Sequence, residues 1–462
     1  MYVQNDVSHD SRVLREATAL AQAGHLVSII GKGQGGDIVA RGGDIASSRG
    51  ATVQILRVSI LAGSPYLRAP WRLVEEAAGD LIGAIRRGPS GLGRALLAVA
   101  RIVVASGWSL VRLPWVAVVN RALRRPVDFH WLDRRRATNV ELFGWRSAAL
   151  TVAPAGDVHH AHDLEALPAA AAAAARDGGA VVYDKHEVFS GDRVLLATGG
   201  WLRRRVLRLE RRLAGQADAI VTVNQPLADE LRAALGLSAT AVPVVVRNCP
   251  PRYDPPATGP DRLRAAAGLA PGTPVALYHG GFSRGRGLEQ LAAAIREPGL
   301  EAVHAVYLGY GPLEPELRAW AADPGAGGRL HVLAAVPPDD LLDWIATADV
   351  AVMAIQPDTL NHRLSTPNKL FEAIAAGVPV VASDFPGLRE VVADPAGPLG
   401  VLVDPTSPAA IGAGIREILD APPPERARIR ARCLAAAHER WNWETESIKL
   451  LELYGRLTGR PW

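Results

Sequence analysis

The chain has 462 residues and a mass of 49.0 kDa, a length typical of two or three α/β domains. Hydrophobic residues make up 48% of it and charged residues 21%, which excludes wholesale disorder, a collagen-like repeat and a polytopic membrane protein. The 51 basic residues give a net charge of only +4 against 47 acidic ones, so we expect no nucleic-acid partner.

Helices and apolar strands alternate along the chain from its start. Residues 10–24 predict a helix that ends at a glycine, and residues 25–31 read as a buried strand. The apolar face of this helix is expected to carry Val13, Leu14, Ala17, Leu20 and Ala21. A strand before it has room only for residues 1–4, so either that strand is short or the start site is misassigned.

The same alternation recurs along the chain and predicts parallel sheets covered by helices on both faces, the doubly wound α/β class. Ligands of such sheets bind at the carboxyl ends of the strands. The repeating helix–strand pairs occupy residues 163–184, 207–223, 288–309, 341–355 and 367–383.

A Pro-rich stretch at 247–272 interrupts the alternation and predicts a boundary between two such domains, residues 1–250 and 251–437. The tail, residues 438–462, reads as an amphipathic helix with large aromatic side chains. We expect this helix to pack across both domains.

Residues 71–136 do not fit the alternation. Arginines and a proline interrupt their apolar runs before any reaches 18 residues, so a membrane-spanning helix is not expected. Trp108, Trp115 and the arginines of 94–125 suit a helix that lies in the interface of an anionic membrane. A helical insertion packed on the first domain, with its arginines in solvent, explains the same pattern, and both interpretations stay open.

The sharpest motif is STPNKLFEAIAAG at 365–377. Thr366 suits a helix N-cap and Pro367 the first helical position, directly after the cap. Lys369 falls in the first turn, where a cation opposes the helix dipole unless an anion binds there. Glu372, one turn further on, could accept hydrogen bonds from the two hydroxyls of a ribose. An exposed Lys–Glu pair is the structural alternative.

A second motif, residues 276–288, combines an apolar strand, a glycine-rich turn with Arg284 and Arg286, and a helix. Glycines let the backbone approach a phosphate, and guanidinium groups bind its oxygens in pairs. A further glycine-rich turn follows another strand, at residues 308–312. A glycine-rich turn alone is weak evidence for a phosphate site, but one opposite a second anion-binding helix end is much stronger evidence.

Two rival interpretations are weaker. Residues 31–36 match Gly-x-Gly-x-x-Gly, the signature of a nicotinamide-dependent oxidoreductase, but no helix is predicted after them to face a pyrophosphate. The histidines of 159–163 invite a metal ion, yet no carboxylate-rich motif accompanies them, so we expect no metal. With only two cysteines and no signal-peptide pattern, a cytoplasmic location is expected.

Together these motifs resemble a family-four retaining glycosyltransferase of the GT-B fold. The resemblance implies two Rossmann-like domains that face each other across a cleft, with the C-terminal helix returning to the N-terminal domain. It covers most of the chain except about 45–150, through segments 10–25, 157–170, 181–189, 217–224, 244–250, 279–291, 309–317, 348–356, 361–392 and 400–405.

The chain departs from the family pattern at two places. Leu364 stands where the Glu-x7-Glu motif has its first glutamate, so Asn361 or backbone groups would have to contact the donor sugar. Gly281 replaces the arginine of the phosphate loop and Arg286 its lysine, and Arg284 would compensate.

The resemblance implies metal-independent transfer of a hexosyl or related group from a nucleotide-diphosphate-sugar to a glycan or lipid-linked acceptor, with attack on the same face and no cofactor. It implies catalytic roles for His186, Arg286 and Lys369, and acceptor contacts for Arg12, His162, Asp163 and Glu187. Implied donor contacts are Gly280, Gly281, Arg284, Arg286, Gly309, Asn361, Pro367, Asn368, Lys369, Leu370 and Glu372, with the base near Ala335 and Val336.

Cell-envelope polysaccharide or glycoconjugate synthesis is the implied setting, with the enzyme peripheral at the inner face of the plasma membrane. A nucleotide-sugar 2-epimerase of related fold and a non-catalytic nucleotide-binding homologue remain alternatives. Analysis of the products separates the three.

Overall fold

The computed structural model describes residues 1–5, 7, 10–33, 43–46, 52–58, 145–188, 200–238, 240–256 and 259–460. The chain divides into two compact units, Met1–Tyr183 with Thr198–Asp218, and Asp184–Ala197 with Ala219–Trp462. The insertion at 71–136, with its basic stretch 94–125, lies outside the described residues, as does the second half of the glycine motif at 31–36. Among the described residues, no helix has the length and apolar character that crossing a bilayer requires. The boundaries expected at 250 and 437 stay predictions.

Pairing at residues 1–4 of the first unit is limited to one residue. Tyr2 forms isolated parallel bridges with Ile30 and Ala161, outside the named strands, so the expectation of a first strand there stays a prediction. Helix α1 (Ser11–Gln22) follows its N-cap Asp10, whose carboxylate accepts a hydrogen bond from a backbone N–H of the first turn. A three-stranded sheet has the order β1-β3-β2, with β1 (Val27–Lys32) parallel and β2 (Gly43–Ala46) antiparallel to β3 (Thr52–Val58).

The buried face of α1 differs from the apolar face that the sequence predicts. Leu14 and Ala21 are only partly buried, whereas Arg12 and Glu16 are buried as an ion pair. Apolar periodicity cannot identify buried charges whose partner lies one turn along the same helix. The burial of Arg12 and Glu16 therefore could not be predicted from the apolar pattern of α1.

A second sheet has the order β4-β5-β6-β7, and the division between the two units falls inside β5. Its helix–strand alternation confirms the prediction for residues 163–223. The elements are α6 (Trp145–Val152), β4 (Val158–His162), α7 (Asp163–Asp177), β5 (Ala180–Lys185), α9 (Gly200–Ala214), β6 (Ala219–Thr222), α10 (Gln225–Leu235) and β7 (Val244–Val245).

The second unit contains a six-stranded parallel sheet of order β10-β9-β8-β11-β12-β13. From the middle of the sheet, β8, β9 and β10 follow one another toward one edge, and β11, β12 and β13 follow one another toward the other edge. The direction in which strands are added therefore reverses between β8 and β11. In doubly wound sheets this switch point creates the ligand crevice. The strands are β8 (Val275–Gly281), β9 (His304–Tyr310), β10 (Leu330–Ala334), β11 (Val350–Met353), β12 (Val380–Ser383) and β13 (Gly400–Val403).

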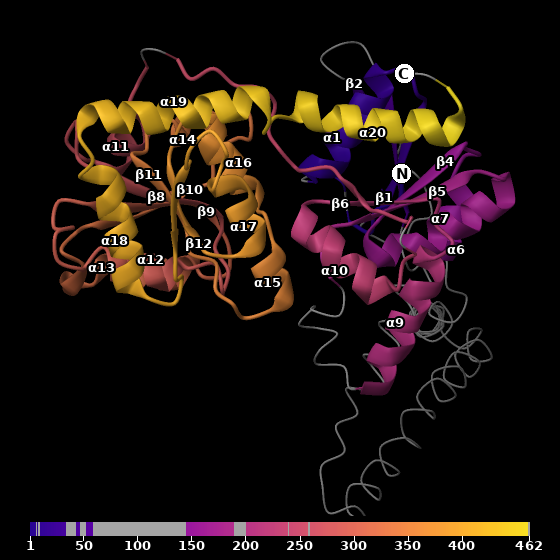
Figure 1. Ribbon diagram of the computed structural model, residues 1–462, viewed down its shortest axis with the longest axis horizontal. Helices are drawn as coiled ribbons and strands as arrows, with labels where there is room; N and C mark the ends of the chain where they lie inside the picture. The colour runs from indigo at the N-terminus through magenta and orange to yellow at the C-terminus, as the bar shows by residue number, and fades with distance from the viewer. Residues whose placement is uncertain are drawn as a thin grey trace, which may run out of the picture. The chain divides into compact units, whose positions relative to one another are not determined.

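Helices cover both faces of this sheet (Figure 1). Side chains alternate along β8: Val275 and Leu277 pack into one core, and Ala276 and Tyr278 into the other. The first core is closed by α11 (Arg262–Ala267), α14 (Leu341–Ile345), α16 (Asn368–Ala375), α17 (Pro386–Val392) and α19 (Pro423–Glu439). The second is closed by α12 (Leu288–Ala294), α13 (Glu314–Ala322) and α18 (Pro408–Leu419).

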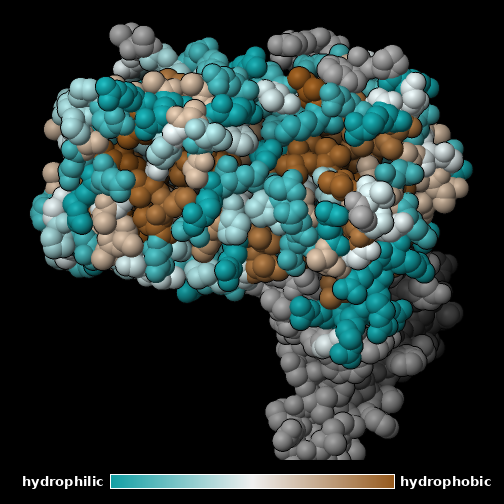
Figure 2. Space-filling view, viewed as in Figure 1, coloured by the Kyte–Doolittle hydropathy of each residue, from teal (hydrophilic) through white to brown (hydrophobic). Residues whose placement is uncertain are grey.

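The remaining helices of the described residues are short α15 (Leu360–Leu364), a 3-10 turn η4 (Pro324–Ala326) and the predicted tail helix α20 (Trp443–Thr458). Large exposed apolar side chains are scattered singly among the described residues, and on the face in Figure 2 the hydrophobic residues gather in a few areas bordered by hydrophilic ones. Such a surface is ordinary for a globular protein. These exposed residues are Leu26, Val242, Tyr310, Leu360 and Ile448.

Candidate functional site

The glycines at the end of β8 belong to the strand itself. Gly280 pairs with Gly309 of β9, and the backbone of Gly280 is left-handed at φ +106°. A Cβ at Gly309 would lie 2.0 Å from the carbonyl oxygen of Gly280, so close backbone packing requires glycine there. The turn expected at 308–312 is wrong in its first residues, because β9 continues through Tyr310.

The loop after β8 packs against the loop after β11, at the switch point. Gly285 and Gly287 have φ values of +77° and +82°, and a Cβ at Gly287 would lie 2.2 Å from the carbonyl oxygen of Ala354. Gly285 also accepts a hydrogen bond from the backbone N–H of Gln356 at 2.9 Å. The two glycines therefore allow the loop to fold down over the end of the sheet.

Helix α16 points its N-terminus into the same region, but its cap differs from the prediction. Pro367 is the N-cap, so the expected cap at Thr366 is wrong by one residue. The Thr366 hydroxyl instead donates to the carbonyl of Gly387 at 3.0 Å and accepts from the side chain of Asn224 at 2.8 Å. Because proline offers no side-chain acceptor, the cap position leaves the first N–H groups of α16 available to an anion.

The ammonium group of Lys369 lies at the end of β8. Its Nζ is 3.8 Å from the centre of the Tyr278 ring, and a Cβ at Gly280 would lie 3.4 Å from Nζ. Burial, and next the positive charge of Arg286, lower the pKa of Lys369 to about 7, while Glu372 acts in the opposite direction. A cation held in surroundings that disfavour its charge is suited to receive an anion.

Glu372 and His279 form a pair that the sequence does not reveal. The Glu372 Oε2 atom is 3.0 Å from Nε2 of the buried His279, on β8. His279 appears in the sequence only as one polar residue of an apolar strand, and its partner lies 93 residues away. This contact fixes one carboxylate oxygen, and the role of Glu372 toward a ribose stays a prediction.

The two loop arginines have different surroundings. Arg286 is half-buried, and its charge acts on Lys369. The side chain of Arg284 is 72% exposed and forms an ion pair with Glu316 at 3.7 Å. The structure therefore brings Arg286 to the lysine, and the compensating role of Arg284 stays a prediction.

Other predicted donor residues have identified contacts within the second unit. Asn361 accepts a hydrogen bond from the backbone of Val188 at 2.8 Å and donates to Glu187 at 3.0 Å, which brings a residue predicted for the acceptor beside one predicted for the donor. Asn368 accepts from Asn248 at 2.9 Å. The side chain of Leu370 packs into the core. Ala335 and Val336 directly follow β10, at the carboxyl edge of the sheet.

Of the residues predicted for catalysis or the acceptor, His162, Asp163, His186 and Glu187 lie at or directly after the ends of β4 and β5. His186 Nε2 lies 2.9 Å from Oδ2 of Asp184, a buried carboxylate that the sequence analysis did not single out. His162 is the last residue of β4, and Asp163 begins α7 with a left-handed φ of +59°. Backbone strain of this kind at a non-glycine residue is typical of functional sites.

Comparisons with known proteins agree with this arrangement. The model of the family described as Glycosyl transferases group 1 matches residues 273–421, and that of Glycosyltransferase Family 4 matches 102–248. D-inositol 3-phosphate glycosyltransferase of Xylanimonas cellulosilytica is 32% identical over 264 residues, 54% of this chain and 60% of that protein. The match thus spans about three fifths of this relative's length.

Two further proteins complete the comparison. A GDP-mannose-dependent alpha-(1-6)-phosphatidylinositol monomannoside mannosyltransferase of Mycolicibacterium smegmatis is 28% identical over 273 residues, 56% of this chain and 68% of that protein. The solved structure of sucrose-phosphate synthase from Thermosynechococcus elongatus superimposes with a TM-score of 0.59 at 18% identity, over 97% of this chain and 93% of that one. With both family models matched and parallel sheets in two units, the chain belongs to the family-four glycosyltransferases and has the GT-B fold.

Proposed function

We propose that this protein is a retaining glycosyltransferase that moves a hexosyl or related group from a nucleotide-diphosphate-sugar to a glycan or lipid-linked acceptor. One observation carries the proposal. The ammonium of Lys369 lies beside Gly280 at the switch point of the sheet, next to Arg286 and to a helix N-terminus whose cap provides no side-chain acceptor. These groups form a cationic site for a diphosphate.

In the proposed reaction the anomeric carbon loses its bond to a diphosphate oxygen, which leaves with the bonding electron pair. The acceptor hydroxyl oxygen bonds to the same face of that carbon, and its proton goes to the departing diphosphate. Negative charge grows on the diphosphate as the bond breaks, and Lys369, Arg286 and the N–H groups of α16 stabilise that charge. His186, held by Asp184, is the group proposed to act at the transferred sugar.

Ligand-induced thermal stabilisation tests the donor site. A nucleoside diphosphate at ~100 times its Kd should add about 2.7 kcal/mol to the free energy of unfolding. We expect one of UDP, GDP, ADP, CDP and dTDP, without metal, to raise Tm, and the double variant Arg286→Ala, Lys369→Ala to lose the shift. Arg318→Ala, which removes an exposed cation paired with Glu314 on α13, is the matched control and should keep it.

Analysis of the products tests the transfer itself. With the stabilising diphosphate as leaving group, we expect a glycoside whose anomeric configuration equals that of the donor. Isomerisation of the donor sugar without an acceptor would favour the 2-epimerase alternative, and binding without turnover the non-catalytic one. No Tm shift with any diphosphate would reject the donor site.

The acceptor and the cellular location are proposed on narrower support. The relative from Mycolicibacterium smegmatis is named for a phosphatidylinositol mannoside, a lipid-linked acceptor. Residues 94–125 carry tryptophans and arginines suited to an anionic membrane surface. We therefore place the enzyme in the cytoplasm, peripheral to the inner membrane face and active in cell-envelope glycan synthesis. Co-flotation with anionic but not neutral vesicles supports this location, and no flotation contradicts it.

A further inference from the structure

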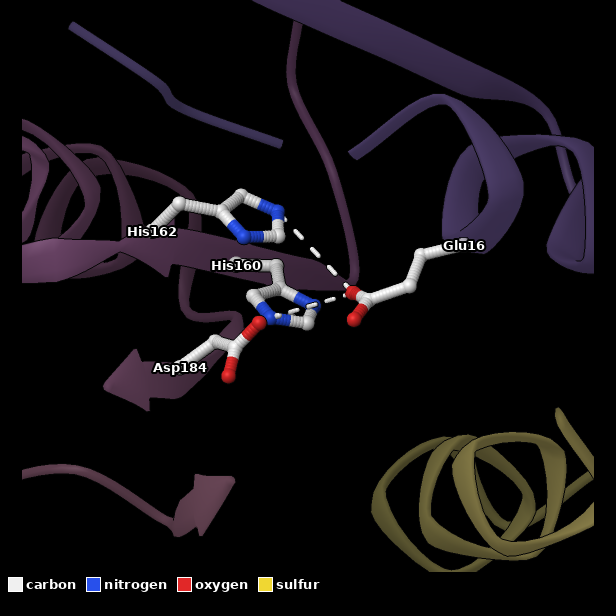
Figure 3. Close-up of side chains that lie close together, drawn as sticks. All are labelled: Glu16, His160, His162 and Asp184. Carbon is white, nitrogen blue, oxygen red and sulfur yellow. Dashed lines mark ion pairs between the residues drawn. The ribbon is translucent and has the colours of Figure 1, made fainter. Parts of the chain in front are cut away.

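Four ionisable side chains meet in the interior near the carboxyl ends of β4 and β5 (Figure 3). They are Glu16 of α1, His160 and His162 of β4, and Asp184 of β5, the residue that directly follows the first unit along that strand. One nitrogen or oxygen atom from each lies within 4.8 Å of the others, and all four residues are buried. None of them is among the residues predicted to bind the donor, and His162 is the one that is also predicted to contact the acceptor.

The strand geometry explains why the side chains of the two histidines lie next to each other. Residues two apart on a strand point to the same face, so His160 and His162 stand side by side. Their rings are stacked, with centroids 4.5 Å apart and planes 10° from parallel. Their Nε2 atoms lie 3.8 and 4.0 Å from the same atom, Oε2 of Glu16. Two imidazole nitrogens therefore face one carboxylate oxygen, as Figure 3 shows.

We propose that Glu16, His160, His162 and Asp184 bind one divalent first-row transition-metal ion, for which zinc is the probe. Two imidazoles and two carboxylates form a ligand set that such ions accept, and four ligands complete a tetrahedral zinc site. Zinc–ligand bonds of ~2.1 Å place neighbouring ligand atoms about 3.4 Å apart. The observed 3.8 and 4.0 Å need to contract by only about half an ångström.

Groups outside the ligand set hold the two carboxylates in place. The Oε1 atom of Glu16 lies 3.0 Å from Nε of Arg12, which leaves Oε2 directed at the histidines. Asp184 is held through Oδ2 by His186 at 2.9 Å. Outer contacts of this kind orient the ligands of metal sites. A divalent ion would add positive charge beside two buried carboxylates, one of which already pairs with Arg12.

Burial of all four ligands indicates a structural role. A closed site without an open position holds protein segments together and does not activate a water molecule. The ion would join α1, β4 and β5, and it would fix Asp184, the partner of His186. The expectation of no metal rested on the missing acidic motif beside the histidines. The fold supplies those carboxylates from the first helix and the next strand.

Metal binding by the full-length wild-type protein provides the first test, independent of donor binding and of transfer. After treatment with a chelator, titration with zinc against a chromophoric competitor should give one ion per chain. X-ray absorption of the zinc-loaded protein should show a nitrogen and oxygen shell with about two imidazoles. A folded protein that binds no zinc, cobalt or manganese, or a zinc shell without imidazole, would overturn the proposal.

Isosteric variants locate the ion. Glu16→Gln and His162→Gln should each weaken zinc binding at least tenfold. His304→Gln is the matched control, because Nδ1 of His304 lies 2.9 Å from Nε2 of His331 in a separate, half-buried pair that could capture zinc adventitiously. The proposal requires this control to bind like the wild type. Zinc lost in the control and kept in the two variants would place the ion at the other pair and reject the site.

Discussion

Lys369 owes its chemistry to neighbours from one distant motif, residues 276–288. The Tyr278 ring and Gly280 come from the strand, and Arg286 comes from the loop that follows it. The sequence predicts the lysine, because a cation in a first helical turn is locally unfavourable. It does not predict the ring beneath the ammonium or the pairing of Glu372 with His279, because both contacts require the helix and the strand to be placed together.

The lowered pKa of Lys369 leads to a pH dependence of donor binding. The free protein loses this proton as pH rises through about 7, whereas a bound diphosphate favours the charged form, so binding takes up a proton. Affinity should therefore fall by about tenfold per pH unit above about pH 7.5, where phosphate groups with pKa near 6 are already ionised. Calorimetric titration with the stabilising diphosphate measures this slope.

Two variants show whether the slope belongs to this lysine. Lys369→Arg keeps a charge that does not titrate, so its binding should stay constant over the same pH range. Lys369→Met should bind weakly at every pH, while the Arg318→Ala control keeps the wild-type slope. A wild-type protein with constant affinity, or a methionine variant with the full slope, would show that another group controls binding.

At the scale of elements, the helix–strand alternation was predictable because it depends on the local spacing of apolar residues. The strands at the switch point and the helix of residues 367–377 appear where the apolar pattern places them. The ends of elements were less predictable. Strands β8 and β9 extend through glycines that read as turns, because two glycines facing each other let the backbones approach closely.

This close approach predicts a large difference in stability between alanine substitutions at two glycines on neighbouring strands. Gly309→Ala should cost about 2–4 kcal/mol of unfolding free energy, because its Cβ would lie 2.0 Å from the carbonyl oxygen of Gly280 and would separate the strands. Gly281→Ala, at the end of β8, has no atom within 4 Å of its Cβ and should change stability by less than about 0.5 kcal/mol. Urea unfolding of the two variants measures both values, and equal losses would contradict the backbone argument.

At the scale of the whole molecule, the start of the Pro-rich stretch is tied to the end of the chain. Arg247, the first residue of that stretch, is held by the C-terminal helix. Its backbone N–H donates to Oε2 of Glu446 at 2.8 Å, its guanidinium pairs with Glu390 and Glu446, and the same group lies 5.1 Å from the Trp441 ring centre. The amphipathic tail was predictable from its pattern, but the contacts of Arg247 were not, because a surface arginine and a half-buried one look alike in sequence.

The contacts of Arg247 with the C-terminal helix predict that the stability of the protein depends on this one guanidinium group. Arg247→Met should lower the free energy of unfolding by about 2–4 kcal/mol, because Glu446 is only 1% exposed and would lose a cationic partner inside the protein. Lys449, 2.7 Å from the same carboxylate, keeps the loss below that of a charge left entirely alone.

Arg296→Met, which breaks an exposed pair with Asp323 at 3.4 Å, is the control and should cost less than about 1 kcal/mol of unfolding free energy. The double variant Arg247→Met, Glu446→Gln separates charge from packing in a urea titration. Recovery of more than half of the loss assigns it to the buried carboxylate, whereas no recovery assigns it to the contact with Trp441.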